Sequence, residues 1–493
     1  MRHFPGVYKE DGLVELVGTL PPGPLSNADI APTAIAERTW NLGHIAALWI
    51  AMSVCIPTYM LAAAMVGAGL SWCMSLLAIV AGNAIVLVPL LINGHAGTKY
   101  GIPFPAYARA AFGTRGAHVP SLLRSVVACG WFGIQTWIGG LAISAIMGIL
   151  WSGWSDIGGG ATFMGHGLPE YIGFVLFWLI NMYFVFAGTE SIKGLETFAA
   201  PFLVAIGIAL LAWALNAAGG LGPILAASDR LAAAQPQTSR LGYLVTLFIP
   251  WLTAMVGFWA TLALNIPDFT RYARSQKDQV LGQSIGLLTA MPLVAFTGVA
   301  VTSATVIRYG EAIWNPVDLV VRLTADADSP LLGLLAMFAL ALATLSTNIA
   351  ANVVAPANSF SNLAPQQIGF RSGGLIAGAI GVLIFPWLLL DAYQTWLISY
   401  SGLLGAVGGV IVCDYLVIRR GELDLKGLYG GNDAYAYAGG VNHAAMKALA
   451  AGILVALAGK LHPALAFLFN GAWFTATAVA FVVYWRLMKQ PAR

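Results

Sequence analysis

The segment 130–137 reads GWFGIQTW and places a glutamine one helical turn after a tryptophan inside a long apolar run. Trp131 and Gln135 are four residues apart, so in a helix they lie on one face. The indole offers a flat surface to a planar ring, and the carboxamide offers both a donor and an acceptor. Together they would suit a flat heterocyclic amide. The alternative is a glutamine bound to a neighbouring helix, with the tryptophan as packing.

Two more segments carry residues that could act with this pair. Trp259 lies in the middle of another apolar run, where a membrane-interface anchor is not expected, so its indole could close the other side of a ring. The segment 343–352, ATLSTNIAAN, brings Ser346, Thr347 and Asn352 within a few helical turns. Their oxygens suit a hard cation or, for Asn352, a substrate amide. The alternative is that the hydroxyls bind carbonyls of their own helix.

The composition is too apolar for a soluble protein, so the elements that position these residues must lie in a membrane. Hydrophobic residues make up 59% of the 493 and charged residues 9%, against about 25% charged in a soluble domain. The apolar runs are long and continuous, so they predict helices and not barrel strands. The sequence predicts an all-α protein with twelve spans near 43–66, 70–93, 121–150, 170–189, 198–218, 242–266, 281–307, 331–355, 373–390, 394–418, 445–461 and 464–487.

The basic residues predict how the chain is oriented. All but five of the 24 Lys and Arg fall in segments that are cytoplasmic if both termini are cytoplasmic; the exceptions are Arg230, Arg240, Arg308, Arg322 and Lys460. Such a bias follows the positive-inside rule. We therefore expect a multi-pass protein of the cytoplasmic membrane, in contact with the lipid bilayer, with both ends inside the cell.

Two spans carry helix-breaking residues at corresponding places, five spans apart. Span one contains Pro57, and span six contains Gly257, with Pro267 near its end. Paired interruptions favour a transporter built on inverted repeats, with helices one and six broken. The alternative is that prolines and glycines are simply common in membrane helices.

The sequence lacks the residues that several kinds of chemistry require. The seven histidines form no ligand cluster, and the sequence has neither a GxxxxGK[ST] phosphate loop nor an HExxH motif. Carboxylates inside the spans are nearly absent, which favours a cation held by neutral oxygens over a proton relay. We expect no enzyme, no cofactor and no nucleic-acid partner; the oligomeric state stays open, and a monomer is compatible with the sequence.

Four stretches in the same order resemble the nucleobase–cation symporter-1 family, which includes hydantoin, allantoin, cytosine and uracil permeases. They are GTKYGIPFPAYARAAFGTRGA, WFGIQTW, STNIAAN and DYLVIRRGELDLKGLY. The resemblance implies a five-plus-five inverted-repeat fold that works by alternating access. Its expected parts are a cytoplasmic segment 1–42, repeats 43–220 and 242–418, two additional helices in 445–487, and a cytoplasmic tail 488–493.

The resemblance also implies roles for single residues. Trp131, Gln135, Trp259 and Asn352 match the family's substrate-binding positions. A sodium site would use the carbonyls of Ala51, Val54 and Ala343 and the hydroxyls of Ser346 and Thr347.

Two positions depart from hydantoin-type and allantoin-type relatives. Cys55 stands where such relatives have a carboxamide, and Phe258 stands where the hydantoin type has glycine. Both changes predict a smaller and less polar pocket, which favours a compact pyrimidine such as uracil. The alternatives are an allantoin or hydantoin permease, or an uncoupled facilitator. Sodium is the expected coupling ion, with a proton as the alternative.

Overall fold

The computed structural model describes residues 7–10, 12–16, 25–187, 205–235 and 239–489. Within them two short hairpins pair β1 (Val7–Glu10) with β2 (Leu13–Leu16) and β3 (Thr162–Phe163) with β4 (His166–Gly167). In this described part of the chain, seven single helices are long and apolar enough to cross a membrane, or up to 10 spans if each of 3 bent pairs counts as one. Two shorter apolar helices, Phe370–Leu383 and His443–Ala458, lie where the sequence predicts spans nine and eleven.

The described helices fall into a first half, a second half and a C-terminal part of the chain. The first half contains η1 (Ile35–Glu37), α1 (Leu42–Ser53), α2 (Ile56–Gly67), α3 (Trp72–Tyr100), α4 (Phe104–Phe112), α5 (His118–Leu150), η2 (Ser152–Asp156), α6 (Leu168–Ala187), the helix Ala205–Ala218 and α8 (Leu221–Ala233). The second half contains α9 (Arg240–Tyr243), η3 (Leu244–Phe248), α10 (Ile249–Asn265), α11 (Pro267–Thr270), α12 (Gln276–Tyr309), α13 (Pro316–Ala327), α14 (Pro330–Asn352), α15 (Val354–Leu363), α16 (Phe370–Leu383), α17 (Pro386–Asp391), α18 (Tyr393–Val412) and η4 (Cys413–Ile418). The chain ends with α19 (Leu425–Leu428), α20 (His443–Ala458), η5 (Pro463–Leu465), α21 (Ala466–Asn470) and α22 (Ala472–Lys489). Residues 188–189 of span four and 198–204 of span five lie outside the described residues.

Two long helices, α3 and α12, begin and end in the same way. Each follows a serine whose side chain accepts a backbone N–H, contains one internal proline, and stops at a glycine. The φ angle is 66° at Gly101 and 77° at Gly310, in the left-handed region where glycine avoids the clash of a Cβ. One such helix in each half is what an internal repeat predicts.

The break in span one lies two residues before the predicted one. Helices α1 and α2 meet at 53° across Val54 and Cys55. Pro57 is not the interruption, because it sits in the first turn of α2, where its missing N–H would have had no helical partner.

The break expected beside Gly257 and Trp259 in span six is absent, and this expectation is corrected. Helix α10 runs without interruption through both residues. A Cβ on Gly257 would lie 2.8 Å from the carbonyl oxygen of Leu397, so the glycine allows α10 to pack closely against α18. The chain departs from α-helix at the π-helical η3 before α10, and at Ile266, after which α11 begins with Pro267.

Two later spans are also interrupted. Span nine bends at Phe385, which has a φ of 54° directly before Pro386. In span twelve the helix pair Pro463–Asn470 and Ala472–Lys489 is bent by 81°. Both spans are therefore less regular than continuous apolar runs predict.

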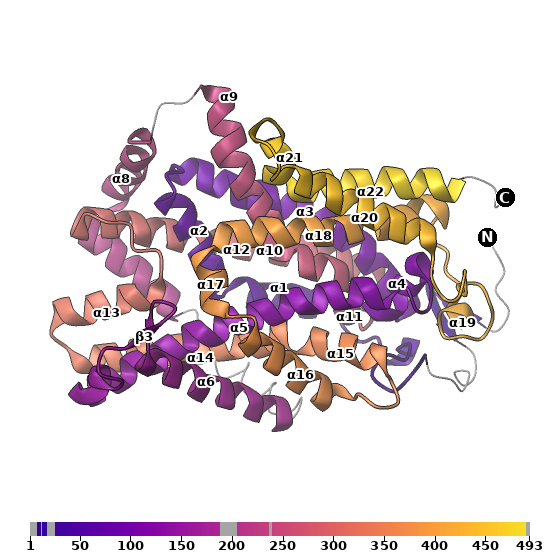
Figure 1. The fold of residues 1–493 in the computed structure, drawn as a ribbon, viewed down its shortest axis with the longest axis horizontal. Coiled ribbons are helices and arrows are strands. Elements are labelled where there is room, and N and C mark those ends of the chain that lie inside the picture. Colours follow the sequence, from indigo (N-terminus) through magenta and orange to yellow (C-terminus); the bar gives the residue numbers. More distant parts are fainter. Residues whose placement is uncertain (1–6, 11, 17–24, 188–204, 236–238, 490–493) are drawn as a thin grey trace.

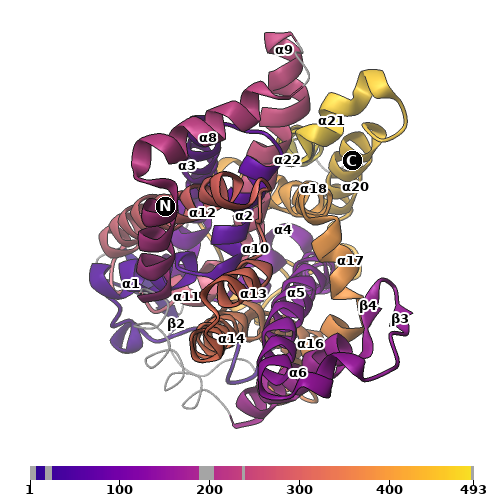
Figure 2. The same cartoon turned by 90° about the vertical axis from the view of Figure 1, so that its left-hand side faces the viewer.

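The helices form two groups joined by a third. Helices α1, α2, α3, α10 and α12 pack on one another, as do α5, α6, α14, α15 and α16. Helices α18, α20 and α22 form the third group, in which α18 also packs against α10. Figure 2 shows α5, α6, α14 and α16 gathered on one side of the molecule.

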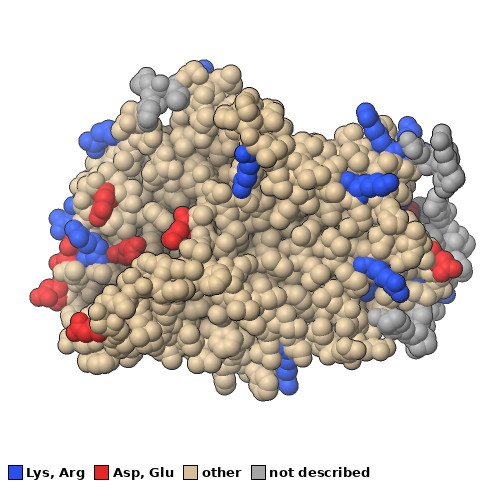
Figure 3. All heavy atoms as spheres, viewed as in Figure 1, with Lys and Arg blue, Asp and Glu red and all other residues tan. Residues whose placement is uncertain are grey.

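The charged residues lie mainly toward the two ends of the long axis. On the face in Figure 3 a broad middle band carries few of them. In Figure 1 α4 and α19 lie at one end, whereas β3, α8 and α13 lie toward the other. The middle band has the apolar surface that a bilayer requires.

Candidate functional site

A cavity of about 40 Å³ lies where the break between α1 and α2 meets α5, α10 and α14. The six residues that the sequence assigns to a substrate all line it: Cys55, Trp131, Gln135, Phe258, Trp259 and Asn352. Thr347, assigned to a cation, lines it too. Sequence reasoning missed Met52, Pro57, Thr261, Leu262 and Ala351, because small or apolar residues within apolar spans carry no signal of what they face.

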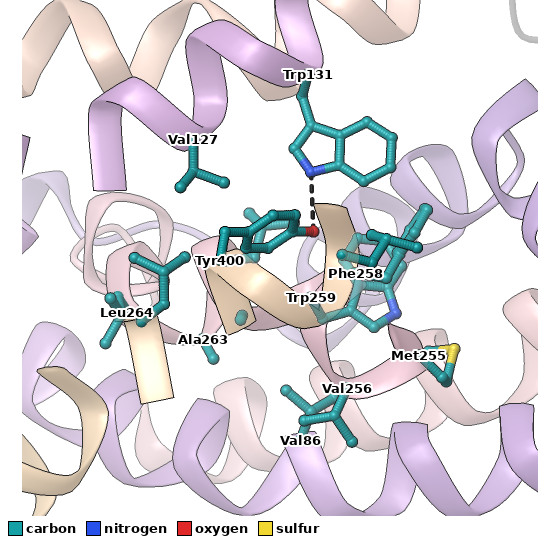
Figure 4. Packing of buried hydrophobic residues seen from close by; sticks show 14 of the residues in the cluster. Val86, Val127, Trp131, Met255, Val256, Phe258, Trp259, Ala263, Leu264 and Tyr400 are labelled. Atoms are coloured by element: carbon teal, nitrogen blue, oxygen red, sulfur yellow. Dashed lines mark hydrogen bonds between the residues drawn. The ribbon is translucent and has the colours of Figure 1, made fainter. Parts of the chain in front are cut away.

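Aromatic rings form one wall of the cavity and are fixed from behind. The ring of Trp131 lies 5.2 Å from Phe258 and 4.9 Å from Trp396, both edge to face. Its indole N–H donates to the hydroxyl of Tyr400 at 3.1 Å (Figure 4). Because the N–H is bound behind the ring, Trp131 can offer the cavity only apolar surface.

Trp259 is held in a comparable way by residues outside the cavity. Its indole N–H points at Asn83 Oδ1 and at the sulfur of Met291, both at 3.0 Å. The ring of Trp49 packs against it edge to face at 5.2 Å. Nothing in the sequence around Asn83 or Met291 indicates this role, since both lie within apolar spans of other helices.

The two carboxamides of the cavity differ in how they are bound. Gln135 is 3% exposed, and its Oε1 accepts no hydrogen bond from any described residue. Asn352 donates from Nδ2 to Asn348 Oδ1 at 3.0 Å. A buried polar atom without a partner costs about 1–3 kcal/mol, so Gln135 has hydrogen-bonding capacity that a ligand would satisfy.

Cys55 sits at the break itself, as the residue before α2. Its side chain is buried and lies 3.2 Å from the hydroxyl of Thr58. Cys55 lines the cavity at the non-helical turn of span one, and its thiol also contacts a hydroxyl of α2.

The residues assigned to a cation lie on α14 and at the end of α1, with Val54 directly after α1, and the two helices contact each other. The N–H of Cys55 donates to Ser53 O at 3.0 Å, so the carbonyl of Ala51 lacks its usual helical donor. The Thr347 hydroxyl donates to Ala343 O at 3.1 Å, while its oxygen keeps lone pairs for another ligand. The residues present are neutral oxygen donors. The described residues hold no group of three or more His, Cys, Asp or Glu that would suit a transition metal.

Charged side chains lie away from the cavity, toward α4 and α11. Asp268 accepts the N–H of Phe104 at 2.7 Å, and burial raises the pKa of its carboxyl while the charge of Arg124 opposes that rise. Burial lowers the pKa of Arg109 to about 10. None of the described residues that line the cavity is charged, so the cavity suits an uncharged ligand.

A second, more open hollow of about 520 Å³ lies on α13 and the segment before it. Its lining includes Glu311, Trp314, Asp318 and Arg322. It does not contain the paired carboxamides and indoles, so the smaller cavity is the candidate site.

An uncharged cavity at the break of a membrane helix, between two groups of helices, has the organisation of a secondary transporter. The model of the family described as permeases for cytosine/purines, uracil, thiamine and allantoin matches residues 32–476, and the chain belongs to this family. It is a permease and not an enzyme.

Relatives and solved structures agree with this assignment. The chain is 42% identical to the purine-uracil permease NCS1 of Arabidopsis thaliana, over 95% of this chain and 78% of that protein. It is 37% identical to the allantoin permease of Bacillus subtilis, over 94% and 93%. The inward-facing conformation of Mhp1, a nucleobase–cation symporter-1 transporter, superposes with a TM-score of 0.77 at 26% identity, covering 96% of this chain and 95% of that one. The expected all-α inverted-repeat transporter fold is thereby confirmed.

Proposed function

We infer that the protein imports a nucleobase or related cyclic ureide of the uracil type by cation-coupled symport and alternating access. The observation that carries this proposal is Gln135 Oε1, a buried acceptor that no described residue satisfies, beside the indole of Trp131. A planar ring with an N–H group would stack on the indole and pair with the carboxamide.

The size and polarity of the cavity favour a compact ring. Phe258 packs edge to face on both Trp131 and Trp259, at 5.2 and 4.9 Å, and narrows the space between them. Cys55 contributes a weak hydrogen-bonding group where a carboxamide would make two strong bonds. The relative at 42% identity is named for purines and uracil, which supports the same choice. Allantoin is the second candidate, because the relative at 37% identity is an allantoin permease.

Sodium is the proposed coupling ion. The carbonyls of Ala51, Val54 and Ala343 with the hydroxyls of Ser346 and Thr347 would supply five neutral oxygens, a donor set that suits a hard cation. Because Cys55 borders the cavity and follows Val54 directly, cation and substrate would share the break of span one. Occupancy of one site would then favour occupancy of the other.

The orientation in the cytoplasmic membrane is proposed from charge. The segments that the positive-inside rule assigns to the cytoplasm include α4 and α19, and these lie at one end of the molecule (Figure 1). Helices α8 and α13, which carry the excepted Arg230 and Arg322, lie toward the opposite end.

Uptake into proteoliposomes tests the function. Radiolabelled uracil should accumulate against its gradient when sodium is higher outside, and purines, cytosine, hydantoin and allantoin should be ranked by competition. Replacing sodium with choline should abolish accumulation, whereas a protonophore should not. Downhill equilibration alone would establish a facilitator, and accumulation of radiolabelled allantoin without accumulation of radiolabelled uracil would establish the second candidate.

A further inference from the structure

Three asparagines form a chain of hydrogen bonds that ends at the cavity. Asn181 of α6 and Asn348 of α14 are fully buried, and Asn352 lines the cavity. Asn348 Nδ2 donates to Asn181 Oδ1 at 3.2 Å, and Asn352 Nδ2 donates to Asn348 Oδ1 at 3.0 Å. We refer to Asn181, Asn348 and Asn352 as the amide chain.

The direction of every bond in the amide chain is fixed by backbone carbonyls. Asn181 donates from Nδ2 to the carbonyl of Phe177 at 2.8 Å, and a carbonyl can only accept. Its other terminal atom is therefore the oxygen, which must accept from Asn348. A second carbonyl, that of Phe132, lies 3.2 Å from the same nitrogen of Asn348 and demands the same orientation.

The fixed direction reaches the cavity. Asn348 turns its nitrogen to three acceptors: Asn181 Oδ1, the carbonyl of Phe132 and, at 3.1 Å, the hydroxyl oxygen of Thr136. It can therefore offer Asn352 only its oxygen. Asn352 must then turn its own nitrogen to Asn348, which leaves Oδ1 as its free acceptor; no described residue donates to it. The acceptor that the cavity receives from α14 is thus set by residues on α5 and α6.

We propose that Asn348, held by Asn181 and the Phe132 carbonyl, is a positioning residue that makes Asn352 select a ring N–H. The inference rests on the proposed function and narrows its substrate class. It selects rings with an N–H at the edge facing Asn352, as in a lactam or cyclic ureide. It excludes rings whose atom at that position is an oxygen or an unprotonated nitrogen, because two acceptors would face each other in a buried site.

The competing explanation is that the amide chain only joins helices. Buried asparagines also hold membrane helices together, and here they link α14 to α5 and α6. A purely structural role would lower the affinity for all ligands alike when Asn348 is replaced. A positioning role changes the ratio between ligands, and this ratio is the quantity to measure.

The ligands for the test are uracil and the two oxazine-diones in which one ring N–H of uracil is replaced by oxygen. Each analogue has nearly the same shape as uracil and lacks one of its hydrogen-bond donors. Binding to the full-length purified protein is measured by competition with radiolabelled uracil. The wild type should bind uracil roughly tenfold or more tightly than one of the two analogues, the factor that one unmade buried hydrogen bond costs.

Asn348→Leu frees the amide of Asn352 to turn. The affinity for the disfavoured analogue should rise in absolute terms, and the preference for uracil should fall toward equality. Asn348→Asp is the conservative rescue: a neutral carboxylic acid donates to Phe132 O and accepts from Asn352, so the preference should return. Asn348→Ala removes the same amide and puts only a methyl group in its place. It serves as the second variant if Asn348→Leu impairs folding.

Asn93→Leu is the matched control. Asn93 is equally buried and donates to the carbonyl of Ala263 at 2.6 Å, but it does not line the cavity. Its replacement should lower stability and leave the ligand ratio as in the wild type. A wild type without preference between uracil and either analogue, or an unchanged preference in Asn348→Leu and Asn348→Ala, overturns the inference while leaving uracil transport intact. Failure of the wild type to bind uracil or any compound of the competition panel overturns the proposed function, and this inference with it.

Discussion

Buried polar groups are left partly unpaired at the cavity, whereas in the region around Asp414 they are paired with one another. At the cavity Gln135 Oε1 has no partner among the described residues, and the aromatic N–H groups are bound on the far side of their rings. Around Asp414 polar groups from η4, from the segment between η4 and α20, and from α22 bind one another closely. We call Asp414, Arg419, Tyr437, Asn442 and Tyr484 the Asp414 cluster.

Every member of the Asp414 cluster is paired. Arg419 Nε donates to Asp414 Oδ2 at 2.6 Å, and Tyr484 donates to Asp414 Oδ1 at 2.8 Å. Asn442 donates to the carbonyl of Ala111 at 2.7 Å. Burial tends to lower the pKa of Arg419, but the charge of Asp414 with neighbouring tyrosines raises it above its usual value. The cluster therefore fixes the C-terminal helices to α4.

The difference separates groups that hold the fold from groups that await a ligand. A satisfied buried network contributes to stability only while all its members are present. An unsatisfied group costs stability in the empty protein, and a ligand that pairs with it recovers that cost as affinity. Substitutions in the two regions should therefore separate stability from binding.

The largest effect is expected from Asp414→Asn. It leaves Arg419, only 16% exposed, without its counter-charge. Breaking a buried ion pair costs about 3–5 kcal/mol, so the free energy of unfolding should fall by about that amount. Unfolding by SDS in mixed micelles, followed by tryptophan fluorescence, measures it. Arg308→Gln is the control: its pair with Asp326 is long, at 3.7 Å, and 58% exposed on the arginine, so stability should hardly change. Equal losses of unfolding free energy in both variants would show that the Asp414 cluster stabilises the fold no more than an exposed ion pair does.

Gln135→Leu should show the reverse pattern. Loss of the carboxamide should weaken substrate binding by about 1–3 kcal/mol, while the unfolding free energy stays the same or rises, because the buried Oε1 was unpaired. Asn352→Ala should lower both quantities, since it also leaves Asn348 Oδ1 without its donor. Calorimetric titration and the SDS assay measure the two quantities. A Gln135→Leu protein that binds substrate as the wild type does would contradict the role of this residue.

The contrast also explains what the sequence could and could not predict. Trp131, Gln135 and Asn352 are visible because an aromatic–amide pair and two amides one turn apart are unusual in apolar spans. Asn83 and Tyr400, which hold the two indoles, lie on helices far apart in sequence and carry no local pattern. A break near Pro57 was predicted because proline is rare inside helices, but Pro57 lies in the first turn of α2 and the chain breaks at Val54 and Cys55. The break beside Gly257 is absent because glycine also serves close packing, here against Leu397 O, and the sequence does not say which use applies.

Thr347→Ala tests whether a cation bound at the break of span one is coupled to substrate binding in the cavity. If the Thr347 hydroxyl ligates sodium, sodium should lower the substrate dissociation constant in the wild type, and substrate should lower that of sodium by the same factor. Typical coupling is about 1–3 kcal/mol. The variant should lose most of this coupling and keep sodium-free binding, because Trp131 and Gln135 remain. Calorimetry with and without sodium decides: equal affinities in the wild type would remove sodium from the proposal and favour a hydroxyl that only binds Ala343 O.

The smallest effect concerns Cys55, which contributes a weak hydrogen-bonding group to the cavity wall. A small methylthiolating reagent should add bulk to a cavity of about 40 Å³ and block uptake, and saturating substrate should slow the block because it occupies the same space. Cys55→Ser keeps a small polar side chain and should be inhibited far less, relative to its own untreated rate. Cys73 is exposed at the start of α3, away from the cavity, so Cys73→Ser should be inhibited as the wild type is. If Cys55→Ser stays fully sensitive and Cys73→Ser does not, the reagent acts outside the cavity. The thiol would then belong with the groups that only hold the turn between α1 and α2, beside the hydroxyl of Thr58.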